Sequence, residues 1–425
     1  MYRTAIRKVH GRRVWDSRGR PTVEAEIQLE SGITGRAIAP AGASTGSGEA
    51  FDLRDGGARF GGLDVMRAVQ NINGEIARLL EGKDASDQNA IDHILIEADG
   101  TPNKRRLGGN AMIAASMAAL HASAAAHEMP VWRYLSGEDR AFLPLPEIQI
   151  FGGGAHAAKR MDVQDFMVVC LSAKSFSEAL ETSAEIYQAA GTLLAKRGLL
   201  QGVADEGGYW PAFSSNEEAL DALVASIEAA GFVPGVDVGI SIDVAASQFR
   251  EGRFYRLARD AKTVDTDGLI EILQRWIERY PIISVEDPLA EDDVDGFRRF
   301  TAAFRERVQI VGDDLLVTNA GRIREAAVET LCNAVLIKPN QAGTITETLA
   351  ALQAARSAGL APIISARSGE TEDVTIVHLC VGWKAPQLKV GSFSRSERMA
   401  KWNELLRIED SQGRAAIFTR LADAH

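Results

Sequence analysis

The sequence predicts an α/β fold in which a small N-terminal α+β domain precedes a parallel (β/α) barrel. Three patterns indicate this fold: alternating apolar runs near the N-terminus, then alanine-rich helical spacing, then a repeated unit of one apolar strand and one amphipathic helix. Continuous apolar strands separated by helices are typical of a parallel sheet covered on both faces. The number of these units favours closure of the sheet into a barrel.

The N-terminal domain is expected over residues 1–135. Its first part, to about residue 55, alternates between apolar runs such as TVEAEIQLE and turn residues, which is typical of a small antiparallel sheet. The small residues of AGASTG, at 41–46, predict a mobile loop because they restrict the backbone little. The spacing then becomes helical in MRAVQNINGEIARLL and in GGNAMIAASMAALHASAAAHEM.

The barrel is expected over residues 140–425. Six apolar runs (VGISIDV, PIISVED, VQIVGDD, NAVLIK, APIISAR and QLKVG) carry a charged residue at or near the end: Asp243, Glu286, Asp313, Lys338, Arg367 and Lys389. After the first interval these residues are spaced by 22 to 29 positions, which is about what one strand, one helix and two loops require. The C-terminal strand ends of such a barrel form its active-site face, so the charged residues should meet at one mouth.

The overall charge and the cysteines narrow the class of protein. A formal net charge of −11 argues against a nucleic-acid binder, which needs clustered basic residues, and favours small molecules and cations as partners. Cys170, Cys332 and Cys380 lie in apolar segments without CxxC spacing, which predicts buried thiols in a reducing compartment. No signal peptide or membrane-spanning run is evident, so we expect a cytoplasmic protein without a membrane partner.

Three carboxylates close successive predicted strands: Asp243, Glu286 and Asp313. Brought together without a partner they would repel one another and resist burial, and a divalent cation resolves both problems. Ligation by oxygen alone favours Mg²⁺, with Mn²⁺ as a substitute. The alternative is that each acid caps the following helix or pairs with a surface base. Three acids at consecutive strand ends, followed by lysines on later strands, favour the metal.

Two lysines and a glutamate complete the site that the residues themselves predict. Lys338 follows the run AVLI and should point into the mouth, where burial and a nearby cation would lower its pKa towards that of a base. Its alternative role is a structural ion pair with one of the carboxylates. Lys389 would supply positive charge for an anionic substrate. Glu206 precedes two glycines in GVADEGGYWP and is either a general acid or a turn-stabilising carboxylate.

Ten segments, in order and across nearly the whole chain, resemble the enolase family: DSRGRPTVEAEI, AGASTGSGEAFDLRDG, DGTPNKRRLGGNA, ADEGGYWP, SIDVAAS, SVEDPLAEDD, VGDDLLVTN, LIKPNQAGT, ARSGETED and KVGSFSRSERMAKWNELLRIE. Matches of this length and number are far more specific than one short motif. The resemblance implies a capping domain, a TIM barrel whose first units depart from the regular (β/α) pattern, and a homodimer or larger ring. It also implies the glycolytic, Mg²⁺-dependent dehydration of 2-phosphoglycerate to phosphoenolpyruvate.

The resemblance also implies roles for individual residues in proton removal. Three acids would hold the Mg²⁺ that binds the substrate carboxylate: Asp243, Glu286 and Asp313. Lys338 would remove the proton next to that carboxylate, and Lys389 would add positive charge beside it. A lysine base beside Mg²⁺ is an established property of enolase-superfamily sites. Ser44, in the expected mobile loop, would ligate a second Mg²⁺ shared with the phosphate.

The remaining implied residues surround the leaving group and the phosphate. Glu206 resembles the acid that protonates the departing C3 hydroxyl, and Gln164 and Asp165 occupy the neighbouring acidic position. Glu286 and Asp313 would also lie against the substrate. The other residues expected to bind substrate are a phosphate-binding pair and the histidine of a second closing loop: Arg367, Ser368 and His156.

Three departures from the family pattern fall in this site. Ala366 stands where enolases carry a histidine that reaches the phosphate and hydroxyl region, and Asp165 replaces a glutamate. The loop GGGAHAAKRMDVQD has Ala155 for the usual serine, with Lys159 and Arg160 where small or apolar residues are common. Such a pocket would suit a larger or more anionic substrate.

Three functions therefore stay open. The chain is an ordinary enolase that tolerates Ala366, or a paralogue that dehydrates a phosphonate or bulkier analogue of 2-phosphoglycerate, with carboxyphosphonoenolpyruvate synthase as the named example. The third alternative is a catalytically silent binding or structural protein. Six intact acidic and basic site residues argue against the third: Asp243, Glu286, Asp313, Lys338, Lys389 and Glu206.

Overall fold

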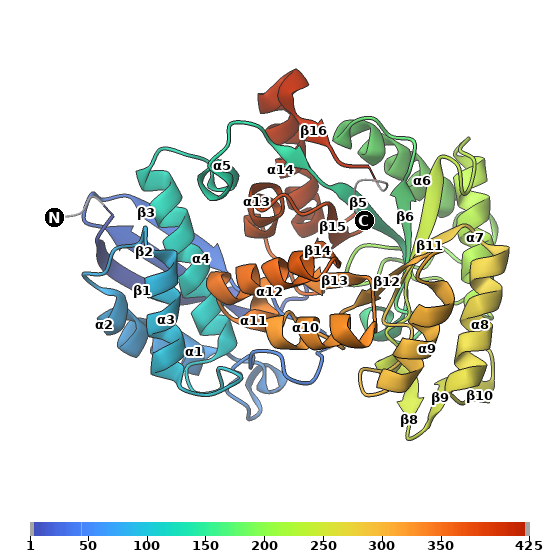
Figure 1. Cartoon of the computed structure of the whole chain (residues 1–425), viewed down its shortest axis with the longest axis horizontal. Coiled ribbons are helices and arrows are strands. Elements are labelled where there is room, and N and C mark those ends of the chain that lie inside the picture. Colours follow the sequence, from blue (N-terminus) through green and yellow to red (C-terminus); the bar gives the residue numbers. More distant parts are fainter. Residues whose placement is uncertain (1–3, 44, 421–425) are drawn as a thin grey trace.

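A computed structural model describes residues 4–43 and 45–420 and shows an N-terminal α+β part beside a closed barrel (Figure 1). The N-terminal elements are β1 (Ile6–Trp15), β2 (Pro21–Leu29), β3 (Thr34–Ile38), α1 (Met66–Asn71), α2 (Ala77–Leu80), α3 (Gln88–Asp99), α4 (Gly109–Ala126) and α5 (Val131–Ser136). The strands form an antiparallel sheet in the order β1-β2-β3. The predicted α+β composition of this part is confirmed.

Helix α4 packs on β2 and β3 of this sheet and is buried along almost its whole length. Its alanine-rich sequence favours helix and presents little bulk. The approach to the sheet is so close that a Cβ atom on Gly35 would lie 2.1 Å from the backbone nitrogen of Ala122. Glycine at position 35 therefore lets the α4 backbone pack directly against β3.

The barrel closes in the order β11-β12-β13-β14-β15-β5-β6-β7. Its strands are β5 (Leu145–Gly152), β6 (Asp165–Cys170), β7 (Val238–Asp243), β11 (Ile282–Glu286), β12 (Gln309–Gly312), β13 (Ala334–Ile337), β14 (Ala361–Ser365) and β15 (Gln387–Gly391). The helices that follow strands are α6 (Phe176–Lys196), α7 (Asn216–Ala229), α8 (Thr266–Arg279), α9 (Val294–Phe304), α10 (Ala320–Glu329), α11 (Pro339–Ala342), α12 (Ile345–Ser357), α13 (Thr375–Gly382) and α14 (Ser396–Gln412). Short strands pair outside the barrel: β4 (Phe142–Leu143) with β16 (Ile417–Phe418), and β8 (Arg250–Glu251) and β10 (Lys262–Val264) with β9 (Phe254–Leu257).

The direction of strand β6 differs from the prediction of a wholly parallel barrel. β6 runs antiparallel to both β5 and β7, whereas the other neighbouring pairs of the described barrel are parallel. The reason is the connection: only the segment 153–164, without a crossover helix, joins β5 to β6, so the chain must turn back directly. Two helices, α6 and α7, then precede β7. This is the irregular start that the family resemblance implied.

Contacts between side chains attach the N-terminal part to the barrel. Asp92 of α3 is fully buried and accepts hydrogen bonds from the backbone nitrogen and hydroxyl of Thr346 at 2.8 and 2.7 Å. His121 of α4 lies 2.8 Å from the hydroxyl of Thr375 in α13, and Asp373 accepts from the backbone nitrogen of Ile38. The N-terminal part is therefore held against the barrel by polar groups.

Two expectations about the chain as a whole can be compared with the fold. Cys170, Cys332 and Cys380 are buried free thiols, as predicted. Burial raises the pKa of each thiol above its ordinary value. In the part of the chain that the structure describes, no helix has the length and apolar character needed to cross a membrane.

Candidate active site

A small cavity opens at the end of the barrel where the predicted site residues meet. Its walls are made by Gly42, Ala43, His156, Gln164, Glu206, Lys338, Ser365, Ala366, Arg367, Ser368, Lys389 and Val390. A small cavity lined by Lys338, Arg367 and Lys389 suits a small anionic molecule. Most of the residues predicted to bind substrate or move protons thus share one enclosure.

Lys389 occupies the centre of the acidic cluster. Its Nζ donates to Glu286 Oε2 at 2.7 Å and to Asp243 Oδ2 at 3.0 Å, and it lies 3.3 Å from Asp165 Oδ2. Burial lowers the pKa of Lys389, but Asp243 and Glu286 raise it, and the result is well above the ordinary value. Lys389 therefore stays protonated and offsets the repulsion among these carboxylates.

Lys338 forms an ion pair with Asp313, whose other oxygen accepts from Gln341 Nε2 at 3.1 Å. Burial lowers the pKa of Lys338, but contact with Asp313 raises it, and the net effect is above the ordinary value. The predicted lowering of this pKa depends on a nearby cation as well as on burial; among the chain's own groups, the adjacent carboxylate outweighs burial. The alternative of an ion pair with a site carboxylate is the one the structure contains.

The acidic residues fit a hard divalent cation. Asp243 Oδ1 is buried and has no hydrogen-bond partner within the described residues. Burial and the nearby Asp243 carboxylate raise the pKa of Glu286 well above its ordinary value, which shows how costly the concentrated negative charge is. Carboxylate oxygens are the ligands that Mg²⁺ prefers. Asp243 and Glu286 are paired in register at the ends of β7 and β11, so they offer these oxygens side by side.

Two further aspartates belong to this acidic region and were missed from the sequence. Oxygens of Asp287, Asp313 and Asp314 lie within 4.8 Å of one another, in a group that could itself hold a metal ion. Asp287 also accepts from the backbone nitrogens of Asp313 and Asp314 at 3.0 and 2.8 Å, so it shapes the turn after β12. The adjacent acidic pairs in SVED and VGDD were the available signal.

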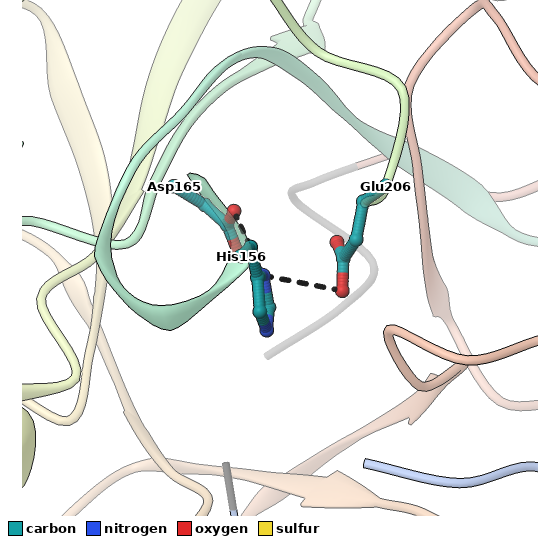
Figure 2. A group of neighbouring side chains, drawn as sticks. All are labelled: His156, Asp165 and Glu206. Atoms are coloured by element: carbon teal, nitrogen blue, oxygen red, sulfur yellow. Dashed lines mark ion pairs between the residues drawn. The ribbon is translucent and has the colours of Figure 1, made fainter. Parts of the chain in front are cut away.

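Glu206, His156 and Asp165 form a second charged group at the mouth, drawn in Figure 2. His156 Nδ1 lies 3.5 Å from Glu206 Oε1 and 3.8 Å from Asp165 Oδ1. Burial raises the pKa of Glu206. Burial also acts to raise the pKa of Asp165, but Lys389 lowers it below the ordinary value. The pKa shifts of the two carboxyls are therefore opposed: Glu206 holds a proton more readily than Asp165 does.

Gln164 lines the cavity beside these residues and contacts Asp243 directly. Its Nε2 donates to Asp243 Oδ2 at 2.8 Å, and its Oε1 accepts from Gln248. Gln149, which the sequence reasoning missed, donates to Asp165 from the neighbouring strand β5. Neither Gln149 nor Gln248 lies in a motif that singles it out.

The predicted phosphate-binding pair already has partners. Arg367 is buried and bonded by both terminal nitrogens to Glu49, at 2.9 Å to Oε2 and 3.2 Å to Oε1. Ser368 Oγ accepts from the backbone nitrogen of Ala43 at 2.7 Å and from Arg18 Nη1 at 3.2 Å. An anion that binds Arg367 must therefore compete with Glu49, a residue that the sequence reasoning missed. Ser44 lies outside the described residues.

Comparison with known proteins agrees with these motifs. Residues 6–135 match the family model of the enolase N-terminal domain, and residues 140–423 match that of the enolase C-terminal TIM barrel domain. The chain belongs to the enolase family. It is 49% identical over 416 residues to "Enolase 1" of Desulfitobacterium hafniense (strain Y51), covering 97% of this chain and 95% of that protein. The chain is accordingly an enolase-type hydro-lyase.

Two of the departures of this enolase, Ala366 and the basic residues of the loop, differ in where they lie. Ala366 lines the cavity, so the space beside it is directly available to a substrate. Arg160 instead stacks on Trp210, 4.8 Å from the ring centre, and bonds to Gln201. Lys159 is exposed, and neither basic residue is among those that line the cavity. Among the described residues, these two basic side chains are therefore not part of the walls of the cavity.

Proposed function

We propose that this enolase catalyses the Mg²⁺-dependent dehydration of 2-phosphoglycerate to phosphoenolpyruvate. The observation that carries the proposal is that Lys338 and Glu206, a base and an acid on different strands and loops, line the same small cavity as Arg367 and Lys389. Removal of a proton and expulsion of a hydroxide need a base and an acid on either side of one substrate.

The roles of the chain's own groups follow from their positions. Lys338, once neutral, takes the proton from C2 of the substrate. Lys389 stays protonated among the carboxylates and offers its charge to the substrate carboxylate. Glu206, whose pKa burial raises, holds a proton that it gives to the C3 hydroxyl, so the C3–O bond breaks and water leaves. Arg367 and Ser368 would orient the phosphate.

Asp243, Glu286 and Asp313 would hold the Mg²⁺, and Ser44 would contribute to a second. When bound, the ion stabilises negative charge that develops on the substrate carboxylate. Assembly into a homodimer or larger ring and a cytoplasmic location are further expectations carried over from the family; sedimentation of the purified protein tests the first.

A steady-state assay tests the proposed reaction directly. We expect phosphoenolpyruvate to form from 2-phosphoglycerate in the presence of Mg²⁺ and not after chelation. Failure of the wild-type protein to form phosphoenolpyruvate with saturating Mg²⁺ would refute the proposed substrate.

One observation favours a second candidate function, the dehydration of a bulkier or phosphonate analogue. Ala366 lines the cavity, and its methyl group leaves room beside Arg367 and Ser368. Ala366→His distinguishes the candidates. If the chain uses 2-phosphoglycerate, the wild type is already highly active and the added imidazole gains little, because the pocket is matched. A rise in kcat/KM of roughly tenfold or more, as one added hydrogen bond can give, would favour the analogue instead.

A further inference from the structure

Polar side chains fill the inside of the barrel directly beneath the candidate active site. At most 2% exposed, they come from five different strands: Glu147 (β5), Ser241 (β7), Ser284 (β11), Gln309 (β12) and Gln387 (β15). Side chains two positions apart on a strand face the same way. Ser241 and Gln387 each precede a site residue by two positions, so this layer lies one step below Asp243 and Lys389. None of its members has a role in the proposed reaction.

The hydrogen bonds of this layer form a chain that ends on Glu147. Ser284 Oγ donates to Gln309 Oε1 at 3.4 Å, and Gln309 Nε2 donates to Gln387 Oε1 at 2.7 Å. Gln387 Nε2 then donates to Glu147 Oε1 at 3.0 Å. The side-chain amides of Gln309 and Gln387 each accept with the oxygen and donate with the nitrogen. Exchanging the oxygen and nitrogen of one amide would therefore require the same exchange in the other.

The direction of this chain is the one that an ionised carboxylate requires. A carboxylate only accepts hydrogen bonds, and the second oxygen of Glu147 accepts from Ser241 Oγ at 3.3 Å. A fully buried charge also needs an opposite charge nearby. Lys389 is paired in register with Glu147 across strands β15 and β5. Burial raises the pKa of Glu147 to about 7, and Lys389 is the strongest influence that opposes this rise.

Glu147 therefore lies beside Lys389 on the neighbouring strand, while other carboxylates contact the ammonium directly. Asp243 and Glu286 contact the ammonium at 3.0 and 2.7 Å. These two are also residues that would hold a cation, and a dication beside them repels the ammonium. The negative charge of Glu147 offsets part of that repulsion. It leaves the carboxylate oxygens of Asp243 and Glu286 available to the cation.

We propose that Glu147 is a positioning residue, whose buried negative charge holds the Lys389 ammonium in the mouth of the barrel and favours binding of a divalent cation beside it. Removing this charge makes the mouth more positive, so it weakens binding of a cation and strengthens binding of an anion. If the substitution acted instead through lost packing or lost hydrogen bonds, binding of the cation and binding of the anion would both become weaker. The inference rests on the proposed function only in the choice of 2-phosphoglycerate as the anion to be tested.

Glu147→Gln tests the charge with little change of shape. The amide oxygen can still accept from Gln387, and the amide nitrogen can donate to Ser241. Calorimetric titrations with Mg²⁺ alone, and with 2-phosphoglycerate at saturating Mg²⁺, give the two affinities. We expect the variant to bind Mg²⁺ roughly tenfold more weakly and 2-phosphoglycerate roughly threefold more tightly. Changes of opposite sign in the two affinities would indicate an effect of charge.

Gln309→Leu is the matched control because it breaks the same hydrogen-bond chain and leaves Glu147 charged. It should not move the two affinities in opposite directions. If Glu147→Gln does not fold, Glu147→Met, which also removes the charge and adds no polar group, is measured with the same expectations. Unchanged affinities, or losses in both, overturn the proposal. If the wild type does not bind 2-phosphoglycerate, the proposed function fails, while the Mg²⁺ titration still decides the role of Glu147.

Discussion

At the scale of single residues, two lysines lie among the acids of the barrel mouth and have different carboxylate partners. Lys389 contacts Asp243 and Glu286 together, whereas Lys338 contacts Asp313. A lysine shared by two carboxylates loses its proton with more difficulty than a lysine held by one. Of the two, Lys338 is therefore the side chain that substrate and cation binding can more readily free to act as a base.

Replacement of Lys338 by alanine tests that role. Lys338→Ala should lower exchange of the C2 proton of 2-phosphoglycerate with solvent deuterium by roughly a hundredfold to ten-thousandfold, the range for loss of a general base. Mg²⁺ binding should be intact or tighter, because the variant removes a cation from Asp313. NMR of the recovered substrate measures exchange, and Lys262→Ala, at an exposed position, is the control. Retained exchange would remove Lys338 from this role.

The charge state of Glu206 leads to a second test. Glu206→Gln keeps the shape of the side chain and removes the proton that its raised pKa retains. Loss of the C3 hydroxyl should slow more than proton exchange at C2, because only the first step needs that proton. Comparing the rate of phosphoenolpyruvate formation with deuterium uptake separates the steps. Equal losses in both would mean that Glu206 serves the geometry of the site instead.

At the scale of elements, the reversed strand β6 changes which residues reach the mouth. Because β6 is antiparallel, its first residue, Asp165, lies in register with Asp243, the last residue of β7. A parallel β6 would put Asp165 at the opposite end of the barrel. The segment 153–164 that produces the reversal also carries His156 and Gln164 into the cavity. One direct connection thus supplies a whole side of the site.

Gln248 holds this segment in place. Its Oε1 accepts from the backbone nitrogen of Ala155 at 2.8 Å, and its Nε2 donates to Gln164. Gln248→Ala removes both bonds, so amide hydrogen exchange in 154–164 should become faster while exchange in α6 does not change. Exchange measured by mass spectrometry checks this, with Gln274→Ala on the exposed face of α8 as the control. Unaltered exchange in 154–164 would show that other contacts hold the segment.

At the scale of the whole molecule, a half-buried histidine, His121, and a buried one, His378, lie where the N-terminal part meets the barrel. The rings of His121 in α4 and His378 in α13 are 6.4 Å apart, and His378 Nε2 lies 3.7 Å from Glu404 Oε1. Burial lowers the pKa of His378 to about 4, helped by His121, and burial also lowers the pKa of His121. Both rings are therefore neutral in the folded protein near neutral pH.

This pair predicts how stability depends on pH. An unfolded histidine takes up a proton near pH 6.5, whereas folded His378 does so only near 4, so the unfolded state binds more protons between these values. The free energy of unfolding should consequently fall as the pH drops from about 6.5 to about 4. Calorimetric Tm values across this range measure it. His378→Met should flatten the dependence and exposed His93→Gln should not; equal slopes in both would contradict the assignment.

Much of the architecture follows from patterns that are local in the chain. Strand and helix periods, and charged residues at the strand ends, place Asp243, Glu286, Asp313 and Lys338 at one mouth before any contact is known. Residues that end parallel strands must share an edge, so their order along the chain is enough. The long motifs likewise predicted the family that the comparisons show.

Contacts between distant segments could not be obtained in this way. The ion pair of Arg367 with Glu49 joins residues far apart in sequence, and the raised pKa of Lys338 depends on its contact with Asp313. The direction of β6 and the charge of Glu147 inside the barrel are also set by their neighbours in space. Periodicity determines which face a side chain occupies, whereas its partner and its protonation depend on what folding brings within a few ångströms.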